Sequence, residues 1–395
     1  MMQVMKCEII LLIVIMAMPA CTNRRNSKTE GDAITIQLNF DERAIMNASK
    51  FVDSISVVLL DDNNDACIGT VSKVDLADSS LIITDLSTMS VFIYHLNGKL
   101  KAKIKAHGRG PGEYVALYTT WINGDNKTIG IYDDEQRKIL LYSFNGQFIK
   151  EYKSPGYIHG FALCGDHGYY YRGMDGFPND NMQPSNIHLI MTSPDSIKLA
   201  LQRDFFFENS ESMPYQKFVR CNDKILLRTP QEQHIYEISG LNIQLKYRVV
   251  LAPNPLWRDE NYLKIKTLKD CKDMVNQSIG KIKNLEYMAG NRFLFFSYSK
   301  GRTIDVSDLA FSIYDMHTNQ VIESGVCCNN KDGFYMKPPV YFNDTLWISS
   351  FHQYEIREDK QSEIEKKYHV DFSQSINPIL VIRKINLPTQ QLQTD

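Results

Sequence analysis

The segment Gly108–Tyr114 (GRGPGEY) combines three glycines and a proline with arginine, glutamate and tyrosine. Glycines allow close or positive-φ backbone approaches and Pro111 fixes one φ, so the polar side chains would be held in place. Aromatic planes together with Arg and Glu suit a carbohydrate or a peptide, through stacking and bidentate hydrogen bonds. The candidate binding residues are therefore His107, Arg109, Glu113 and Tyr114, joined by Tyr157 and His159 from a later segment. The structural alternative is a turn in which Arg109 pairs with Glu113.

The sequence contains none of the common catalytic signatures: it has no GxSxG elbow, no HExxH pair and no P-loop. The adjacent carboxylates Asp133-Asp134 would point to opposite sides of a strand, so they cannot face one substrate. Asp61–Asp65 lacks the glycine and the distal glutamate of an EF-hand loop, which favours a solvated turn over a calcium site. We therefore expect a non-catalytic protein without cofactor or metal. The enzymatic alternative is a glycan hydrolase or lyase that uses His159, Glu113 and Arg109 for acid/base chemistry and charge stabilisation.

Composition narrows the class of partner. The 395 residues include 44 Lys and Arg against 46 Asp and Glu, a formal net charge of −2. Without a large basic excess, a nucleic-acid partner is not expected. Aromatic residues make up 11% of the chain, which suits a β-rich fold better than a helical bundle.

An internal repeat predicts the elements that would position the candidate residues. An apolar strand ending in aspartate, a polar turn, a second strand and an Asn-Gly turn occur at residues 82–98 and again at 130–146. The second copy follows the first by 48 residues, as the numbers of Asp85 and Asp133 show. Asn-Gly between apolar runs is a strong hairpin signal, because both central residues of that turn need positive φ. A period of about 40–50 residues built from consecutive antiparallel strands is typical of a β-propeller blade.

Looser copies of the unit begin near residues 169, 225, 293 and 345, and with the first two they predict six blades. We therefore expect an all-β, six-bladed β-propeller over residues 33–395. A ring of twisted sheets buries faces that a single sheet would expose. The strands Ala33–Phe40 and Ile379–Ile385 would bring the two ends of the chain into the sheets and close the ring.

Helical patterning is nearly absent, with one exception. Asp259–Ile282 has apolar residues at spacings of three and four, which predicts a short helical insertion between blades four and five.

The propeller prediction places the candidate residues. Loops that leave the outermost strand of one blade for the innermost strand of the next all arrive at one face, around the axial channel. GRGPGEY is the first such loop, and the segment with Tyr157 and His159 is the next. We therefore expect His107, Arg109, Glu113, Tyr114, Tyr157 and His159 at the channel mouth. Packing or surface roles are the alternative for Tyr157 and His159.

The N-terminal segment predicts export. An apolar run at Ile9–Ala17 is far shorter than the roughly 20 residues of a membrane-spanning helix, and it predicts a signal peptide over residues 1–20. Met18-Pro19-Ala20-Cys21 resembles the lipobox of bacterial lipoproteins. The resemblance implies cleavage before Cys21 and a lipid anchor on that residue. The alternative is a plain signal peptide that leaves Cys21 unmodified.

The segment after Cys21 is polar, and residues 21–32 are predicted to form a flexible tether. In Bacteroidetes lipoproteins, an acidic tract after the lipidated cysteine resembles a surface-export signal, whereas this chain has Arg24 and Arg25 there. This difference favours a protein on the outer membrane that faces the periplasm, and it leaves surface exposure open.

Four segments resemble the six-bladed β-propeller lipoproteins of Bacteroidetes, which have a TolB-like or NHL-like ring. The segments are residues 51–60, Ile68–Val74, Gly108–Tyr114 and Asn377–Ile382. The resemblance implies the fold and an envelope location, but no settled reaction. We therefore expect an envelope lipoprotein that is a non-catalytic binding or scaffolding module for a glycan, a peptide or a protein partner.

Overall fold

The computed structural model describes residues 33–41, 44–62, 66–172, 187–202, 216–229, 233–256, 267–277, 280–300, 309–326, 333–374 and 376–387. The predicted signal peptide (1–20), the tether (21–32) and the lipidation residue Cys21 lie outside these ranges. The described residues belong to one unit, Ala33–Asp395.

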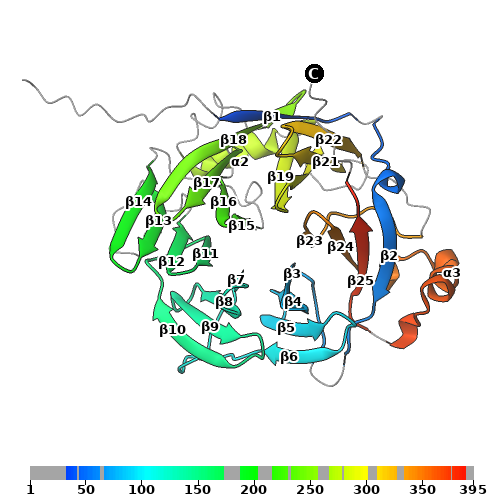
Figure 1. The fold of residues 1–395 in the computed structure, drawn as a ribbon, viewed down its shortest axis with the longest axis horizontal. Helices are drawn as coiled ribbons and strands as arrows, with labels where there is room; N and C mark the ends of the chain where they lie inside the picture. Colours follow the sequence, from blue (N-terminus) through cyan, green and yellow to red (C-terminus); the bar gives the residue numbers. More distant parts are fainter. Residues whose placement is uncertain are drawn as a thin grey trace, which may run out of the picture. The chain divides into compact units, whose positions relative to one another are not determined.

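Six β-sheets surround a central axis as the blades of a propeller, which confirms the predicted fold class (Figure 1). Blade one contains β3 (Lys73–Ala77), β4 (Ser80–Asp85), β5 (Ser90–His95) and β6 (Leu100–Ile104), from the axis outward. Blade two contains β7 (Thr119–Asn123), β8 (Thr128–Asp133), β9 (Lys138–Ser143) and β10 (Phe148–Lys153). Blade three contains β11 (Gly160–Cys164), β12 (His167–Tyr171), β13 (Ile187–Ser193) and β14 (Ser196–Gln202).

The remaining blades follow the same antiparallel order. Blade four contains β15 (Phe218–Cys221), β16 (Lys224–Arg228), β17 (His234–Ser239) and β18 (Asn242–Ala252). Blade five contains β19 (Ile282–Ala289), β20 (Phe293–Lys300), β21 (Leu309–Asp315) and β22 (Gln320–Val326). Blade six contains β23 (Tyr341–Phe342), β24 (Leu346–Phe351), β25 (Ile379–Ile385) and, from the other end of the chain, β2 (Val52–Val58).

The hydrophobic core lies between neighbouring blades. All six residues of β4 are buried, whereas five of the six residues of the outermost strand β10 are exposed. A strand that is covered on both faces reads as a continuous apolar run rather than an alternating one. Ile82 and Ile93 of blade one pack with Ile129 and Ile131 of blade two, and comparable clusters join the other blades. Each blade is therefore stabilised by its neighbours.

The ring is closed by β2, which pairs antiparallel with β25. Ile379–Ile385 thus takes part in closure as predicted, but the prediction for Ala33–Phe40 is wrong. β1 (Ile34–Asn39) instead runs parallel to β18 and adds a fifth strand to the outer edge of blade four. Its alternating side chains Ile36 and Leu38 are buried in the core there, which explains the pattern that suggested a strand.

The repeated turns explain the repeat in the sequence. Gly98 and Gly146 have φ of +85° and +76°, so the left-handed position of each turn is occupied by glycine. Asn97 and Asn145 are not among the positive-φ residues, so the prediction that both central residues need positive φ is wrong. Gly98 N–H donates to His95 O, and a bulge follows in the paired strands. A turn of this kind requires positive φ only at the glycine.

Helix α2 (Leu268–Asn276) lies inside the predicted insertion between blades four and five, while residues 259–266 and 278–279 of that segment are outside the described ranges. Ile282, the predicted end of the insertion, is the first residue of β19. Within the described residues, no helix is long and apolar enough to cross a membrane.

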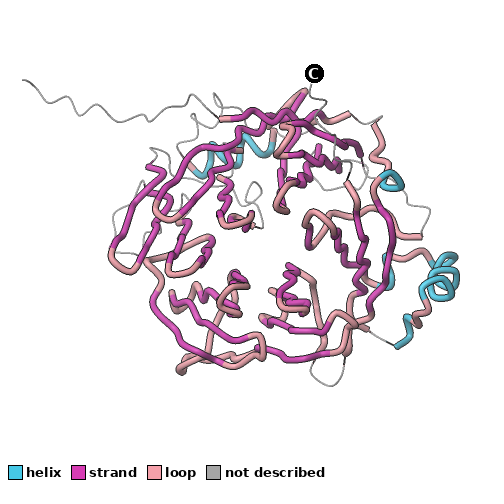
Figure 2. Tube along the Cα trace, viewed as in Figure 1, coloured by secondary structure: helices cyan, strands magenta, loops and turns pink. Residues whose placement is uncertain are grey.

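A second helix, α3 (Glu358–Tyr368), joins β24 to β25 at the outer edge of the ring, and the sequence analysis did not predict it (Figure 2). Ile364 is its one buried residue, so the helix has no apolar stripe to detect. Acidic residues in its first turn and lysines in its last turn favour a helix instead. Short 3-10 turns occur at Ala48–Lys50, Gln353–Glu355 and Phe372–Gln374.

Candidate functional site

The innermost strands of the six blades face the axis of the ring (Figure 1). Residues of these strands and of the segments beside them line two adjoining cavities. The first cavity has a volume of about 370 Å³, and most of its lining comes from the first residues of the innermost strands of blades one to four and from the residues just before these strands. The second cavity, of about 470 Å³, is lined mainly by β3, β7, β15, β19 and β23. Both cavities are lined by Lys73, Trp121, Gln216 and Phe218, so these four residues form the boundary between them.

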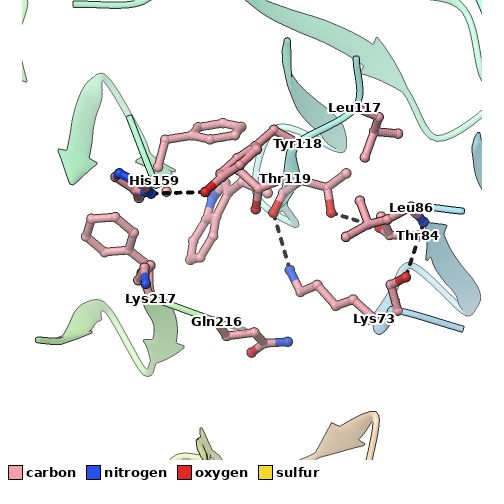
Figure 3. A pocket seen from close by; sticks show the side chains of 15 residues that line it. Lys73, Thr84, Leu86, Leu117, Tyr118, Thr119, His159, Gln216 and Lys217 are labelled. Atoms are coloured by element: carbon pink, nitrogen blue, oxygen red, sulfur yellow. Dashed lines mark hydrogen bonds between the residues drawn. The ribbon is translucent and has the colours of Figure 1, made fainter. Parts of the chain in front are cut away.

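Two lysine side chains line the first cavity. Lys73 and Lys217 line it, and no aspartate or glutamate is among its described lining residues. Lys73 Nζ lies 3.0 Å from Asp75 Oδ2, on the side of the second cavity, and 3.5 Å from the carbonyl oxygen of Thr120. Lys217 is 5% exposed, and its Nζ lies 5.9 Å from the centre of the Tyr171 ring. Figure 3 shows both lysine side chains beside the cavity. Lys73 is the first residue of β3 in blade one, and Lys217 directly precedes β15 in blade four.

His159 is a buried, uncharged polar group in the wall of the first cavity. Its Nδ1 lies 3.0 Å from the Tyr118 hydroxyl, and both residues line the cavity (Figure 3). Burial, followed by the nearby charge of Lys217, lowers the pKa of His159 to about 3. The imidazole is therefore neutral at physiological pH and can accept or donate a hydrogen bond without carrying charge. The Tyr157 ring packs edge-on against the rings of Tyr118 and His159, at centroid distances of 6.1 and 5.1 Å.

Other polar groups of the first cavity divide into two sets. The Ser72 hydroxyl accepts the amide of Leu86, and the hydroxyls of Thr84 and Thr120 bond to each other at 2.8 Å, so these groups stabilise the wall. In the described part of the chain, the side chains of Thr119 and Gln216 make no hydrogen bond. These two side chains can therefore bond to a ligand.

Aromatic rings complete the first cavity. Trp121, Phe161 and Phe218 line it. The indole Nε1 of Trp121 donates to the carbonyl oxygen of Leu163 at 2.8 Å, which fixes the plane of the ring. A few convergent polar groups on an apolar wall are the usual features of a small-molecule site.

The GRGPGEY loop packs against the outer strands of blade two. Gly112 N–H donates to Glu151 of β10, and its carbonyl oxygen accepts the Tyr142 hydroxyl of β9. Tyr114 is fully buried, its hydroxyl donates to the carbonyl oxygens of Met89 and Ile104, and burial raises its pKa to about 12. Tyr114 is therefore a packing residue.

The charged side chains of the same loop do not pair with each other. The Glu113 carboxylate accepts the backbone amide of Gly110 at 2.8 Å, and no ion pair joins it to Arg109 within the described residues. The structural alternative predicted a pair between Arg109 and Glu113, and this pairing is wrong. The Glu113 carboxylate instead stabilises the turn by accepting a backbone amide of the same loop. His107 and Arg109 are exposed.

The structure brings together only part of the predicted set. His159 lines the first cavity with Tyr157 packed beside it, whereas His107, Arg109, Glu113 and Tyr114 line neither cavity. The sequence analysis missed Lys73, Tyr118, Trp121 and Lys217. Their common feature is a position at or next to the start of an innermost strand, a position that the repeat could have identified.

Metal ligands are not clustered in the part of the chain that the structure describes. No group of three or more His, Cys, Asp or Glu side chains there is arranged to hold an ion.

Fold and cavity together define a six-bladed β-propeller with a site of ligand size on its axis. The chain belongs to the family described as DUF4934, a domain of unknown function, whose model matches residues 32–384. The finer resemblance to a TolB-like or NHL-like ring stays a prediction. No curated protein matches the chain.

Two solved structures from Bacteroides share the fold. The chain is similar to a protein of Bacteroides fragilis described as exported, with a TM-score of 0.69 and 15% identity over 90% of this chain and 100% of that chain. It is also similar to a DUF4221 family member from Bacteroides vulgatus, with a TM-score of 0.54 and 10% identity over 86% of this chain and 98% of that chain. Identities this low establish a common fold only.

Proposed function

We propose that this protein is a non-catalytic binding module of the cell envelope, and that its ligand occupies the first cavity. One observation carries the proposal: a cavity of about 370 Å³ combines aromatic walls with the open hydrogen-bonding groups of Thr119 and Gln216. This volume falls in the range of small-molecule sites, about 300–1,000 Å³. A small ligand, or one unit of a longer glycan or peptide, fits this space.

A hydrolase or lyase that uses His159, Glu113 and Arg109 is not favoured. His159 lines the first cavity, whereas the other two residues belong to a loop that packs on blade two. The neutral imidazole of His159 has a pKa of about 3, which makes it a weak general base at neutral pH. Binding without turnover agrees better with these positions.

A binding test of the first cavity uses Thr119→Phe, which places a ring in the open space, and Thr128→Phe on β8 as the control outside both cavities. Isothermal titration covers neutral and acidic sugars, peptidoglycan fragments and short peptides. We expect at least one class to bind, and Thr119→Phe to weaken that binding at least tenfold while Thr128→Phe leaves it unchanged. The proposal would be overturned if none of the tested compounds binds, or if the two variants bind equally well.

The envelope location rests on the sequence of the N-terminal segment, in which Cys21 would carry the lipid that attaches the protein to the outer membrane. The exported relative from Bacteroides fragilis supports export. Cys21→Ser is expected to move the protein from the membrane pellet to the soluble fraction. Cys67→Ser, at an exposed cysteine of the ring, is the matched control and should stay in the pellet. Sedimentation of Cys21→Ser with the membranes would contradict the anchor.

A further inference from the structure

We propose that the second cavity is a second subsite for the same ligand, and that the protein binds a chain of uncharged sugar units whose successive units occupy the two cavities. The inference rests on the proposed function and adds the length and the chemical class of the ligand. Four features carry it: the continuity of the cavities, the paired charges, the open hydrogen-bonding groups and the shared aromatic rings.

The lining passes from the first cavity to the second along the innermost strands. On β7, Thr120 lines the first cavity, Trp121 lines both and Ile122 lines the second. On β15, Phe218 lines both cavities and Arg220 lines the second one only. A strand of five residues such as β7 spans about 16 Å. The two cavities are therefore consecutive parts of one path, and this path is longer than a single sugar ring.

Every charged side chain in the described lining of the second cavity has a partner. These residues are Lys73, Asp75, Arg220 and Asp344. Lys73 Nζ lies 3.0 Å from Asp75 Oδ2, and Arg220 Nη2 donates to Asp125 Oδ2 at 2.7 Å. The Asp344 carboxylate accepts three backbone amides at the turn between β19 and β20. A charged ligand unit would lose hydration here without gaining an unpaired counter-charge, so the second cavity favours an uncharged unit.

The uncharged polar lining has hydrogen-bonding atoms that remain open. The backbone amide of Asn222 donates to Asn291 Oδ1 at 3.1 Å, and Asn222 Nδ2 donates to the carbonyl oxygen of Asn291 at 3.2 Å. Within the described residues, Asn222 Oδ1 accepts no hydrogen bond and Asn291 Nδ2 donates none. The amide of Gln216, which lines both cavities, makes no hydrogen bond there either. Separate donors and acceptors suit sugar hydroxyls, because a hydroxyl both donates and accepts.

The turns that carry these open groups are fixed to one another. The two bonds between Asn222 and Asn291 join the turn after β15 in blade four to the turn after β19 in blade five. Asp344, in the turn after β23, joins blade six to the same turn of blade five. The rim of the second cavity is therefore formed before a ligand arrives, which reduces the entropy lost on binding.

The shared aromatic rings favour a glycan over a peptide. Trp121 and Phe218 line both cavities, and the indole is held in place by its bond to the carbonyl oxygen of Leu163. A sugar ring presents C–H groups on its faces and hydroxyls at its edge, so a unit can pack on these rings while it bonds to Gln216. An extended peptide instead directs successive side chains to opposite sides, so its units do not present one repeated apolar face.

The test is isothermal titration of the whole protein with neutral oligosaccharides of one to four units from the cello-, xylo-, manno- and malto- series. Oligogalacturonate and oligoalanine of the same lengths serve as the acidic and the peptide counterparts. We expect at least one neutral series to bind, and its trisaccharide to bind at least tenfold more tightly than its monosaccharide. Because the ligand is uncharged, this affinity should change less than twofold when salt is raised from 50 to 500 mM.

The variant Gly124→Trp tests the second cavity directly. Gly124 lines this cavity, and a Cβ added at this position lies in open space, so the new ring would occupy the second subsite. We expect Gly124→Trp to weaken trisaccharide binding at least tenfold, to the affinity of the monosaccharide. Lys150→Trp, at an exposed position of β10 in the same blade, is the control and should leave trisaccharide binding unchanged.

The other outcomes separate this inference from the proposed function. Equal affinity for all chain lengths, tighter binding of oligogalacturonate or oligoalanine, or unchanged trisaccharide binding by Gly124→Trp would overturn the inference and leave the proposed function standing. The same holds if other compounds bind but no neutral oligosaccharide does. If nothing binds at all, both are overturned. The comparison of chain lengths uses the unmodified protein, so it decides the question even if Gly124→Trp does not fold.

Discussion

Asp85 and Asp133 occupy the same point of two repeat units, and both carboxylates bind backbone amides. Asp133 accepts the amides of Glu135 and Gln136 in its own turn and that of Val115 in the loop arriving from blade one. Asp85 does the same with Ser87 and with Gly69 of the preceding loop. In blades one and two, the aspartate at the end of the second strand therefore attaches the incoming loop to its blade.

Removal of this carboxylate should destabilise the ring. Asp133→Ala leaves several amides in and around the turn without an acceptor, and we expect the free energy of unfolding to fall by at least about 2 kcal/mol. The nearby Glu135→Ala is the control, because it keeps the backbone amide that donates to Asp133 and removes an exposed carboxylate, and it should cost less than about 0.5 kcal/mol. Chemical denaturation measures both. Equal losses would contradict the assigned role of Asp133.

His159 predicts how stability depends on pH. Its pKa in the folded protein is about 3, below the usual 6.5, because of burial and the nearby Lys217. As the pH falls below 6.5, the imidazole of His159 is protonated in the unfolded chain but not yet in the folded protein. The free energy of unfolding therefore falls by up to about 1.4 kcal/mol per pH unit between pH 6.5 and pH 3. Denaturation curves at pH 6.5, 5.5 and 4.5 should show a shallower decline for His159→Gln than for the unmodified protein. Parallel declines would show that His159 is not held neutral.

At the scale of elements, β1 and β2 are both N-terminal strands but have different roles. β1 covers the edge of blade four, while β2 supplies the fourth strand of blade six and hydrogen-bonds to β25. The loss of β1 exposes the edge of one blade, whereas the loss of β2 opens the ring.

Two truncated chains separate these roles. A chain that starts at residue 44 lacks β1 and therefore loses the burial of Ile36 and Leu38, which contributes about 1.5–3 kcal/mol per side chain. We expect this chain to stay monomeric and to have a lower Tm. A chain that starts at residue 59 also lacks β2 and exposes the edge of β25, which should cause association and loss of cooperative unfolding. Size-exclusion chromatography and melting curves test both. Indistinguishable behaviour would contradict closure by β2.

At the scale of the whole molecule, stability comes from interfaces between blades. Trp347 of blade six is fully buried, and its ring lies 4.8 Å from that of Phe295 in blade five and 6.5 Å from that of Phe51. Because each blade packs on two others, a loss at one interface should affect the ring as a unit.

Calorimetry of Trp347→Ala tests this coupling. We expect a single unfolding transition. The free energy of unfolding should fall by about 3–5 kcal/mol, because a large cavity replaces the indole. Tyr354→Ala removes an aromatic ring that is 82% exposed and should leave the transition nearly unchanged. The appearance of two separate transitions in Trp347→Ala would mean that the blades unfold independently.

Much of the fold could be predicted because its signals are local. Neighbouring residues alone determine the apolar strand that ends at Asp85 and the turn at Gly98. The same holds for the copies of this strand and turn at Asp133 and Gly146. Helix α3 could not be predicted in this way, because a helix with a single buried residue has almost no apolar periodicity.

The sequence by itself determined the six-bladed ring, since each blade is built from strands and turns that are consecutive in the chain. Only the tertiary structure decided which residues meet at the axis. Lys73, Trp121, His159 and Lys217 are separated by about 40–60 residues each, and they converge because equivalent positions of successive blades face the same axis. The same packing directs the GRGPGEY loop onto β9 and β10, through contacts that residues distant in the chain supply.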